Sequence, residues 1–151
     1  MEYKIRQAKI DDAIYLDELL TELIHDERKY DIGINPNFEV KNFYKNIVNK
    51  NDRHILVAEK NNNIIGYIYG FVVNPTTDYN LKVFKIDALY ISEEYRNLHI
   101  ASSLMEEVKK IAKEQKVDFI EVNVLNENTK AYNLYKKENF KETKTTLTYE
   151  I

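Results

Sequence analysis

The segment YRNLHIASSL, residues 95–104, joins a predicted strand to a predicted helix and has the form of an anion-binding turn. The first N–H groups of a helix lack partners within the helix and lie at the positive end of its dipole, so they suit a phosphate. Arg96 stands just before this helix and adds a full positive charge. Phosphate-binding turns are usually rich in glycine, whereas Asn97 and His99 occupy this one. The segment alone is ambiguous, because most strand-turn-helix units bind nothing.

A second segment whose residues could take part in chemistry is VLNENTKAYNLYKKENF, residues 124–140, which follows another predicted strand. It places Asn128 where a short helix begins, and asparagine is a preferred N-cap residue. Tyr135 lies within that helix and carries a phenol, which can hold and deliver a proton. Asn139 stands where a helix often ends in a left-handed residue, a conformation that asparagine tolerates second only to glycine.

Together the two segments resemble the GNAT superfamily of N-acetyltransferases, which transfer an acyl group from acyl-coenzyme A. That family carries Arg or Gln, two residues, Gly, one residue, then Gly or Ala at a helix start, and this chain has R-N-L-H-I-A at 96–101. The strand D-A-L-Y-I and the following S-E-E-Y-R are similar to the family as well. The resemblance is good over about 83–140 and weaker, but consistent in element order, over 1–75. About thirty residues after the first motif the family carries a second one, which stands here as Asn128, Ala131, Leu134, Tyr135, Asn139 and Phe140.

Two residues depart from the family pattern. Asn139 replaces a glycine at a position that asparagine tolerates, so this change is mild. His99 replaces the first glycine of the cofactor motif. A left-handed backbone there would cost a histidine about 1–2 kcal/mol, whereas a helical one would cost little and keep the N–H aimed at the phosphate. A positive φ at His99, or an N–H turned away, would mark the turn as a relic of a cradle.

The resemblance implies that acetyl-CoA is the co-substrate. Its pantetheine arm is expected to bind the backbone of Leu89, Tyr90 and Ile91, in a gap between splayed strands 83–91 and 119–125. Asn128 would either contact the cofactor arm or cap its own helix, and both roles stay open. The pyrophosphate is expected to bind Arg96 and the backbone of the residues that follow it, which are Asn97, Leu98, His99, Ile100 and Ala101.

The resemblance also implies an acid at Tyr135, which would protonate the departing thiolate. A free tyrosine has a pKa near 10 and a thiol near 8.5, so donation is mildly uphill. The alternative for Tyr135 is an aromatic side chain that only packs on the sheet. Asp87 is our first choice as the proton acceptor, helped by burial that raises its pKa or by a relaying water. The alternative for Asp87 is a plain strand-surface carboxylate, and Glu121 is a weaker candidate base.

Tyr30 and Asp31 belong to the acidic loop HDERKYD, where the family builds its acceptor pocket, and with Asp87 they are candidate substrate-binding residues. A solvated run of charges is the alternative for any single loop member. The acceptor is expected to be a small primary amine, and the acidic residues favour a cationic one. A protein N-terminus or a lysine stays open. With no cysteine in the chain, direct transfer in a ternary complex is expected, and the three scattered histidines predict no metal site.

Alternating and helical hydrophobic patterns predict the order β-α-α-β-β-β-α-β-α-β. This order indicates an α/β fold, one GNAT-type domain over 1–151, with a mixed, mostly antiparallel sheet, splayed central parallel strands and about four helices. Helices are predicted after Asp11 or Asp12, at about 39–49, at 100–115 and at 128–138. Strands are predicted at 3–8, 54–60, 64–73, 83–91, 119–125 and 141–151.

Composition narrows the class of partner. The 151 residues carry a net charge of −3, which gives no support for nucleic-acid binding. The longest mostly apolar run, 64–73, is too short to span a membrane, and the N-terminus has no signal-peptide pattern, so a cytoplasmic protein is expected. A homodimer is left open. The rival interpretations are a module of the same fold that binds acyl-CoA without catalysis, and an interaction domain that binds no nucleotide.

Overall fold

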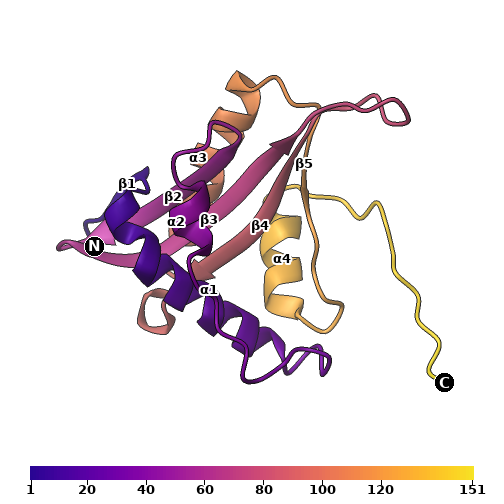
Figure 1. Ribbon diagram of the computed structural model, residues 1–151, viewed down its shortest axis with the longest axis horizontal. Coiled ribbons are helices and arrows are strands. Elements are labelled where there is room, and N and C mark those ends of the chain that lie inside the picture. Colours follow the sequence, from indigo (N-terminus) through magenta and orange to yellow (C-terminus); the bar gives the residue numbers. More distant parts are fainter.

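The computed structural model describes residues 1–151, whose helices pack on both faces of a five-stranded sheet (Figure 1). The first three strand pairs are antiparallel and the last is parallel. The strands lie in chain order as β1 (Lys4–Gln7), β2 (Arg53–Lys60), β3 (Asn63–Val73), β4 (Val83–Ile91) and β5 (Phe119–Val122). The helices are α1 (Ala13–Glu27), α2 (Phe43–Ile47), α3 (Ile100–Glu114) and α4 (Thr129–Lys137), with 3-10 turns η1 (Ile10–Asp12) and η2 (Glu93–Tyr95). The predicted mixed α/β fold with four helices is confirmed.

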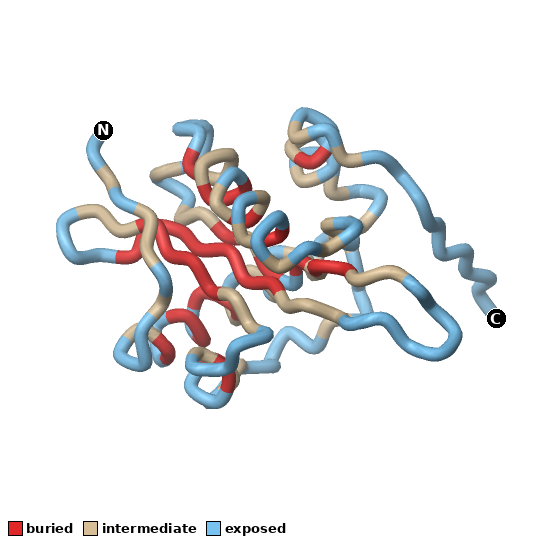
Figure 2. Tube along the Cα trace, turned by 90° about the horizontal axis from the view of Figure 1, so that it is seen from above, coloured by how far each residue is buried: buried red, intermediate tan, exposed pale blue.

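The sheet carries a separate hydrophobic core on each face, because side chains alternate along a strand. One face buries Tyr67 and Tyr69 against α1 and α2, and the Tyr44 hydroxyl of α2 donates to the Tyr67 hydroxyl at 2.9 Å. The opposite face packs against α3 and α4 (Figure 2). The helical stripe predicted for residues 100–115 forms much of this second core, with Ile100, Leu104, Met105, Val108 and Ala112 buried.

Strands β4 and β5 separate toward their carboxyl ends. They pair only from Val83 with Phe119 to Ile86 with Val122, so residues 87–91 have no partner on the β5 side. A β-bulge lies at the same point, because Ile86 faces Gly70 and Ala88 faces Tyr69. Asp87 is therefore the extra residue, and a bulge of this kind redirects a side chain. The predicted parallel pair is confirmed, but β5 lies at the edge of the sheet and not at its centre.

Two predicted elements differ from the structure. The strand predicted over 141–151 is wrong, since these residues are all exposed, make no backbone hydrogen bond and extend away from the sheet (Figure 1). Strand propensity acts through packing on a partner strand, and this segment has none. The helix predicted at about 39–49 is only Phe43–Ile47, because Asn42 before it is left-handed, with φ 58°. No helix is both long and apolar enough to cross a membrane.

Candidate active site

The turn between β4 and α3 presents a row of free hydrogen-bond donors. The backbone N–H groups of residues 97–102 donate to no acceptor within the protein. Asn97 and His99 both have φ 62°, while Leu98 between them does not have a positive φ. Alternation of this kind gathers successive N–H groups into a concavity that suits an anion. The dipole of the 15-residue helix α3 adds to the attraction, so the turn has the geometry of a phosphate cradle.

His99 adopts the left-handed conformation that the family's glycine would adopt at no cost. The helical alternative for this residue is therefore wrong. The positive φ that we expected in a relic is present, but it does not by itself remove the anion site. The backbone keeps the shape that a glycine would give it, and the His99 N–H is tied to no other acceptor. The substitution costs about 1–2 kcal/mol of strain without removing a donor.

The Arg96 side chain has three contacts within the protein. Its Nε donates to the Ile91 carbonyl at 2.8 Å, and its guanidinium lies 5.5 Å from the centre of the Tyr90 ring. A third contact, at 3.7 Å, joins it to Asp26 at the end of α1. Arg96 would have to leave these partners to reach a phosphate, so its predicted role stays a prediction.

Helix α4 holds Tyr135 in place from both ends. Asn128 Oδ1 accepts the Ala131 N–H at 3.2 Å, so the capping role is confirmed and the cofactor contact stays a prediction. At the other end Asn139 has φ 69°, as predicted. The Tyr135 side chain packs edge-on against Phe140, with ring centroids 5.4 Å apart.

The Tyr135 residue is only 8% exposed, yet its hydroxyl has no hydrogen-bond partner in the protein and is not sealed from the surface. Burial raises the pKa of this phenol above its ordinary value, and the negative charge of Glu27 adds to the shift. The phenol therefore stays protonated at neutral pH, and its raised pKa makes proton donation to a thiolate more uphill than it is for a free tyrosine.

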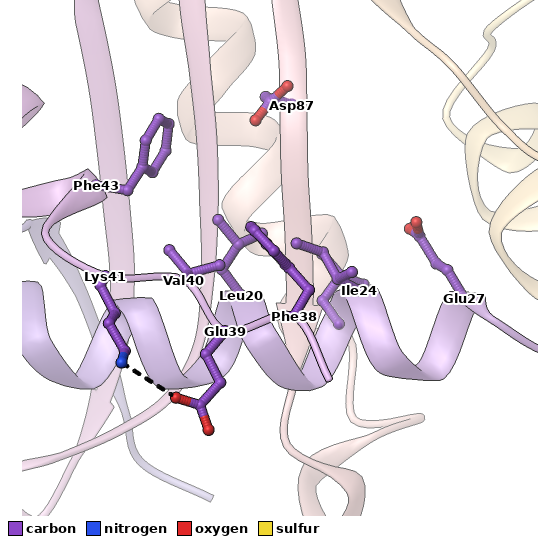
Figure 3. A pocket seen from close by; sticks show the side chains of 10 residues that line it. Leu20, Ile24, Glu27, Phe38, Glu39, Val40, Lys41, Phe43 and Asp87 are labelled. Carbon is purple, nitrogen blue, oxygen red and sulfur yellow. Dashed lines mark ion pairs between the residues drawn. The ribbon is translucent and has the colours of Figure 1, made fainter. Parts of the chain in front are cut away.

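A cavity of about 610 Å³ lies between α1, the segment that leads into α2, and the bulge of β4 (Figure 3). Neither the Glu27 nor the Asp87 carboxylate in its wall has a hydrogen bond or ion pair within the protein, whereas Glu39 pairs with Lys41 at 3.7 Å. Six of the ten lining residues are apolar. The full set is Leu20, Leu23, Ile24, Glu27, Phe38, Glu39, Val40, Lys41, Phe43 and Asp87.

Both unpaired carboxylates in the cavity wall bind protons more readily than free ones. Partial burial raises the pKa of Asp87, and the charge of Arg53 opposes this shift. Burial also raises the pKa of Glu27, reinforced by the charges of Asp31, Asp87 and Asp26. Negative charge is thus poorly compensated at this wall, which favours a cation or a proton there.

The structure brings only part of the predicted substrate set together. Asp87 lines the cavity, but Tyr30 and Asp31 do not. Asp31 Oδ1 accepts the Gly33 N–H at 3.0 Å within a turn, and the Tyr30 ring lies 5.0 Å from the Lys29 ammonium. Glu121 forms an ion pair with Lys85 at 3.7 Å, and a carboxylate next to a positive charge is a weaker base.

Glu27 belongs to the segment HDERKYD, which was predicted to be a loop that lines the acceptor pocket, and it does line the cavity, but from the end of α1 rather than from a loop. The helix runs one turn further than its apolar residues suggest, and Glu27 is its last residue. Its spacing of seven from Leu20 and three from Ile24 continues the apolar stripe, and that was the available signal. No group of three or more His, Cys, Asp or Glu side chains is placed to hold a metal ion.

Comparison with known proteins agrees with this architecture. A mutant of the BH1408 protein from Bacillus halodurans superposes with a TM-score of 0.90 at 22% identity, covering 98% of this chain and 99% of that one. An aminoglycoside acetyltransferase from an uncultured soil sample gives a TM-score of 0.75 at 16% identity, covering 99% and 96%. The ribosomal-protein-alanine N-acetyltransferase of Brucella melitensis gives 0.71 at 15% identity, covering 99% of both chains. None of the curated protein sequences matches this one.

At these identities the solved structures show the fold alone. Family membership comes from the sequence profile of the acetyltransferase (GNAT) family, which matches residues 17–140. That range runs from α1 through the cradle and α4 to Phe140. The chain therefore belongs to the GNAT family of acetyltransferases.

Proposed function

We propose that this protein transfers the acetyl group of acetyl-CoA directly to a small primary amine within a ternary complex. The observation that carries the proposal is the opening between β4 and β5. The free N–H groups of residues 97–102 follow the carboxyl end of β4, and residues 89–91 have no partner on the β5 side. The cradle would hold the pyrophosphate, and the pantetheine arm would add to the unpaired edge of β4.

The proposed proton steps give one role each to Asp87 and Tyr135. Asp87 would take a proton from the substrate ammonium, directly or through water, because only the neutral amine attacks the thioester carbon that acetyl-CoA supplies. A new C–N bond forms and the C–S bond breaks. Tyr135 would give its proton to the departing sulfur and regain one as the amide nitrogen loses its second proton. One proton leaves to solvent through Asp87, so atoms and charge balance.

Binding and transfer are tested separately. Acetyl-CoA at a hundredfold excess over Kd should stabilise the protein by about 2.7 kcal/mol, which a thermal shift detects. Release of the CoA thiol should then depend on the presence of an amine. A protein that neither shifts with millimolar acetyl-CoA nor releases thiol would exclude the proposal.

A second candidate is a module that binds acyl-CoA without catalysis, and one observation favours it. His99 has a strained left-handed backbone at a position where a glycine would be unstrained. Such strain is expected in a phosphate site that does not need to bind its ligand tightly. A thermal shift with acetyl-CoA, combined with no amine-dependent thiol release, would support this candidate over the transferase.

A further inference from the structure

We infer that the cavity beside β4 takes a primary amine carried on an apolar body, with its single ammonium between Glu27 and Asp87. This inference rests on the proposed transferase activity and adds the chemical class of the acceptor. It starts from the contrast within the cavity wall between unpaired carboxylates and apolar side chains.

The two carboxylates define where the positive charge belongs. Glu27 is half-buried and Asp87 is exposed, and neither side chain has a hydrogen bond or an ion-pair partner within the protein. Both carboxylates lie in the wall of one cavity, and the charge of Asp87 acts on Glu27. An ammonium in this cavity would be attracted by both carboxylates.

The remainder of the wall defines the body of the acceptor. Figure 3 shows Leu20, Ile24, Phe38 and Val40 between Asp87 and the Glu39–Lys41 ion pair. A sugar hydroxyl or a second ammonium against these side chains would lose its hydrogen bonds to water without replacement. An alkyl or aryl body would instead gain from burial. The volume, about 610 Å³, lies in the range of sites that hold small organic ligands.

The experiment measures kcat/KM for thiol release with matched acceptors. An alkylamine series from propylamine to hexylamine should show a rise of about fourfold per methylene, and phenethylamine should be a better acceptor than spermidine or kanamycin. Equal or better activity with spermidine or kanamycin would overturn the inference while leaving the transferase proposal intact. Thiol release with none of the amines would instead remove the proposed function.

Two substitutions test the two halves of the cavity. Phe38 lines the cavity and is 47% exposed. Phe38→Ser should raise KM for hexylamine about tenfold and leave KM for acetyl-CoA unchanged. Ile32→Ser is the matched control, since Ile32 is 89% exposed and lies outside the cavity. Glu27→Gln should raise KM for hexylamine by a similar factor, with the melting temperature kept. An unchanged KM for hexylamine in both Phe38→Ser and Glu27→Gln would contradict this assignment.

Discussion

The Phe140 backbone N–H donates to the Tyr135 carbonyl at 2.9 Å, and the side-chain rings of the same two residues pack edge to face. The bond closes the end of α4 over the left-handed Asn139 in a Schellman arrangement. Tyr135 is thus fixed through both its backbone and its ring, while its hydroxyl keeps no partner within the protein. A phenol held in this way is oriented before any substrate arrives.

Replacement of Tyr135 by phenylalanine should lower kcat by about 10²–10⁴-fold, because the departing thiolate loses its proton donor. The melting temperature should stay the same, since the lost hydroxyl makes no hydrogen bond in the protein. Tyr132→Phe, one turn earlier and on the surface, is the control that should keep full turnover. Unchanged kcat in Tyr135→Phe would remove this residue from the mechanism.

Asp87→Asn should lower activity and raise stability together. The folded protein holds the Asp87 proton more tightly than the unfolded chain, so the ionised carboxylate costs stability once the pH exceeds its ordinary pKa of 3.8. That cost grows as the pH rises through the raised folded pKa. Urea unfolding at pH 7 should show the variant more stable than the wild type, with the difference vanishing below pH 3.8. A less stable variant would mean that Asp87 serves the fold.

The pH dependence of transfer should follow the same group. Asp87 accepts a proton only when it is ionised, so kcat/KM should fall as the pH drops through its raised pKa, with a midpoint above 3.8. Initial rates of thiol release across pH 4 to 8, for the wild type and Asp87→Asn, measure this limb. An acid limb that is identical in both proteins would assign it to another group.

His99→Gly should stabilise the protein, because the relief of about 1–2 kcal/mol of strain exceeds the entropy that glycine adds to the unfolded chain. The expected rise in melting temperature is about 2 °C. KM for acetyl-CoA should stay within twofold, since the backbone donors do not move. His99→Ala keeps the strain and removes only the imidazole. A higher KM in His99→Ala would show that the side chain itself contacts the cofactor.

Asn128→Ala should cost about 1 kcal/mol of folding free energy, because the Ala131 N–H loses its cap. Asn128→Asp keeps the cap and should restore stability. KM for acetyl-CoA separates the two roles that the sequence left open. If Asn128 only caps α4, Asn128→Asp has the KM of the wild type, whereas a cofactor contact by its amide would raise that KM.

Most of the fold could be predicted because its signals are local. Alternation along residues 83–91 and the apolar stripe of 100–115 define β4 and α3 almost to the residue. The strand predicted at 141–151 has the same local pattern, but a strand also needs a neighbour, and no sequence pattern shows whether one is present.

The site was less predictable because it depends on contacts between distant segments. The sequence made Asp87 a candidate base, but it did not show the bulge that redirects this residue, which arises from the register of β4 against β3. The role of Glu27 depends on where α1 ends and on the charge of Asp87, which is 60 positions away in the sequence. Helical spacing alone reveals neither the end of the helix nor this distant charge. His99 shows the converse, since its type argued against a left-handed backbone that the turn nevertheless imposes.

The most direct test of the central claim is the initial rate of CoA thiol release from saturating acetyl-CoA, with and without hexylamine. We predict a rate that rises with amine concentration to saturation, with N-acetylhexylamine formed in equal amount to the free thiol. A protein that is stabilised by acetyl-CoA but releases no thiol with hexylamine, phenethylamine, spermidine or kanamycin would contradict it.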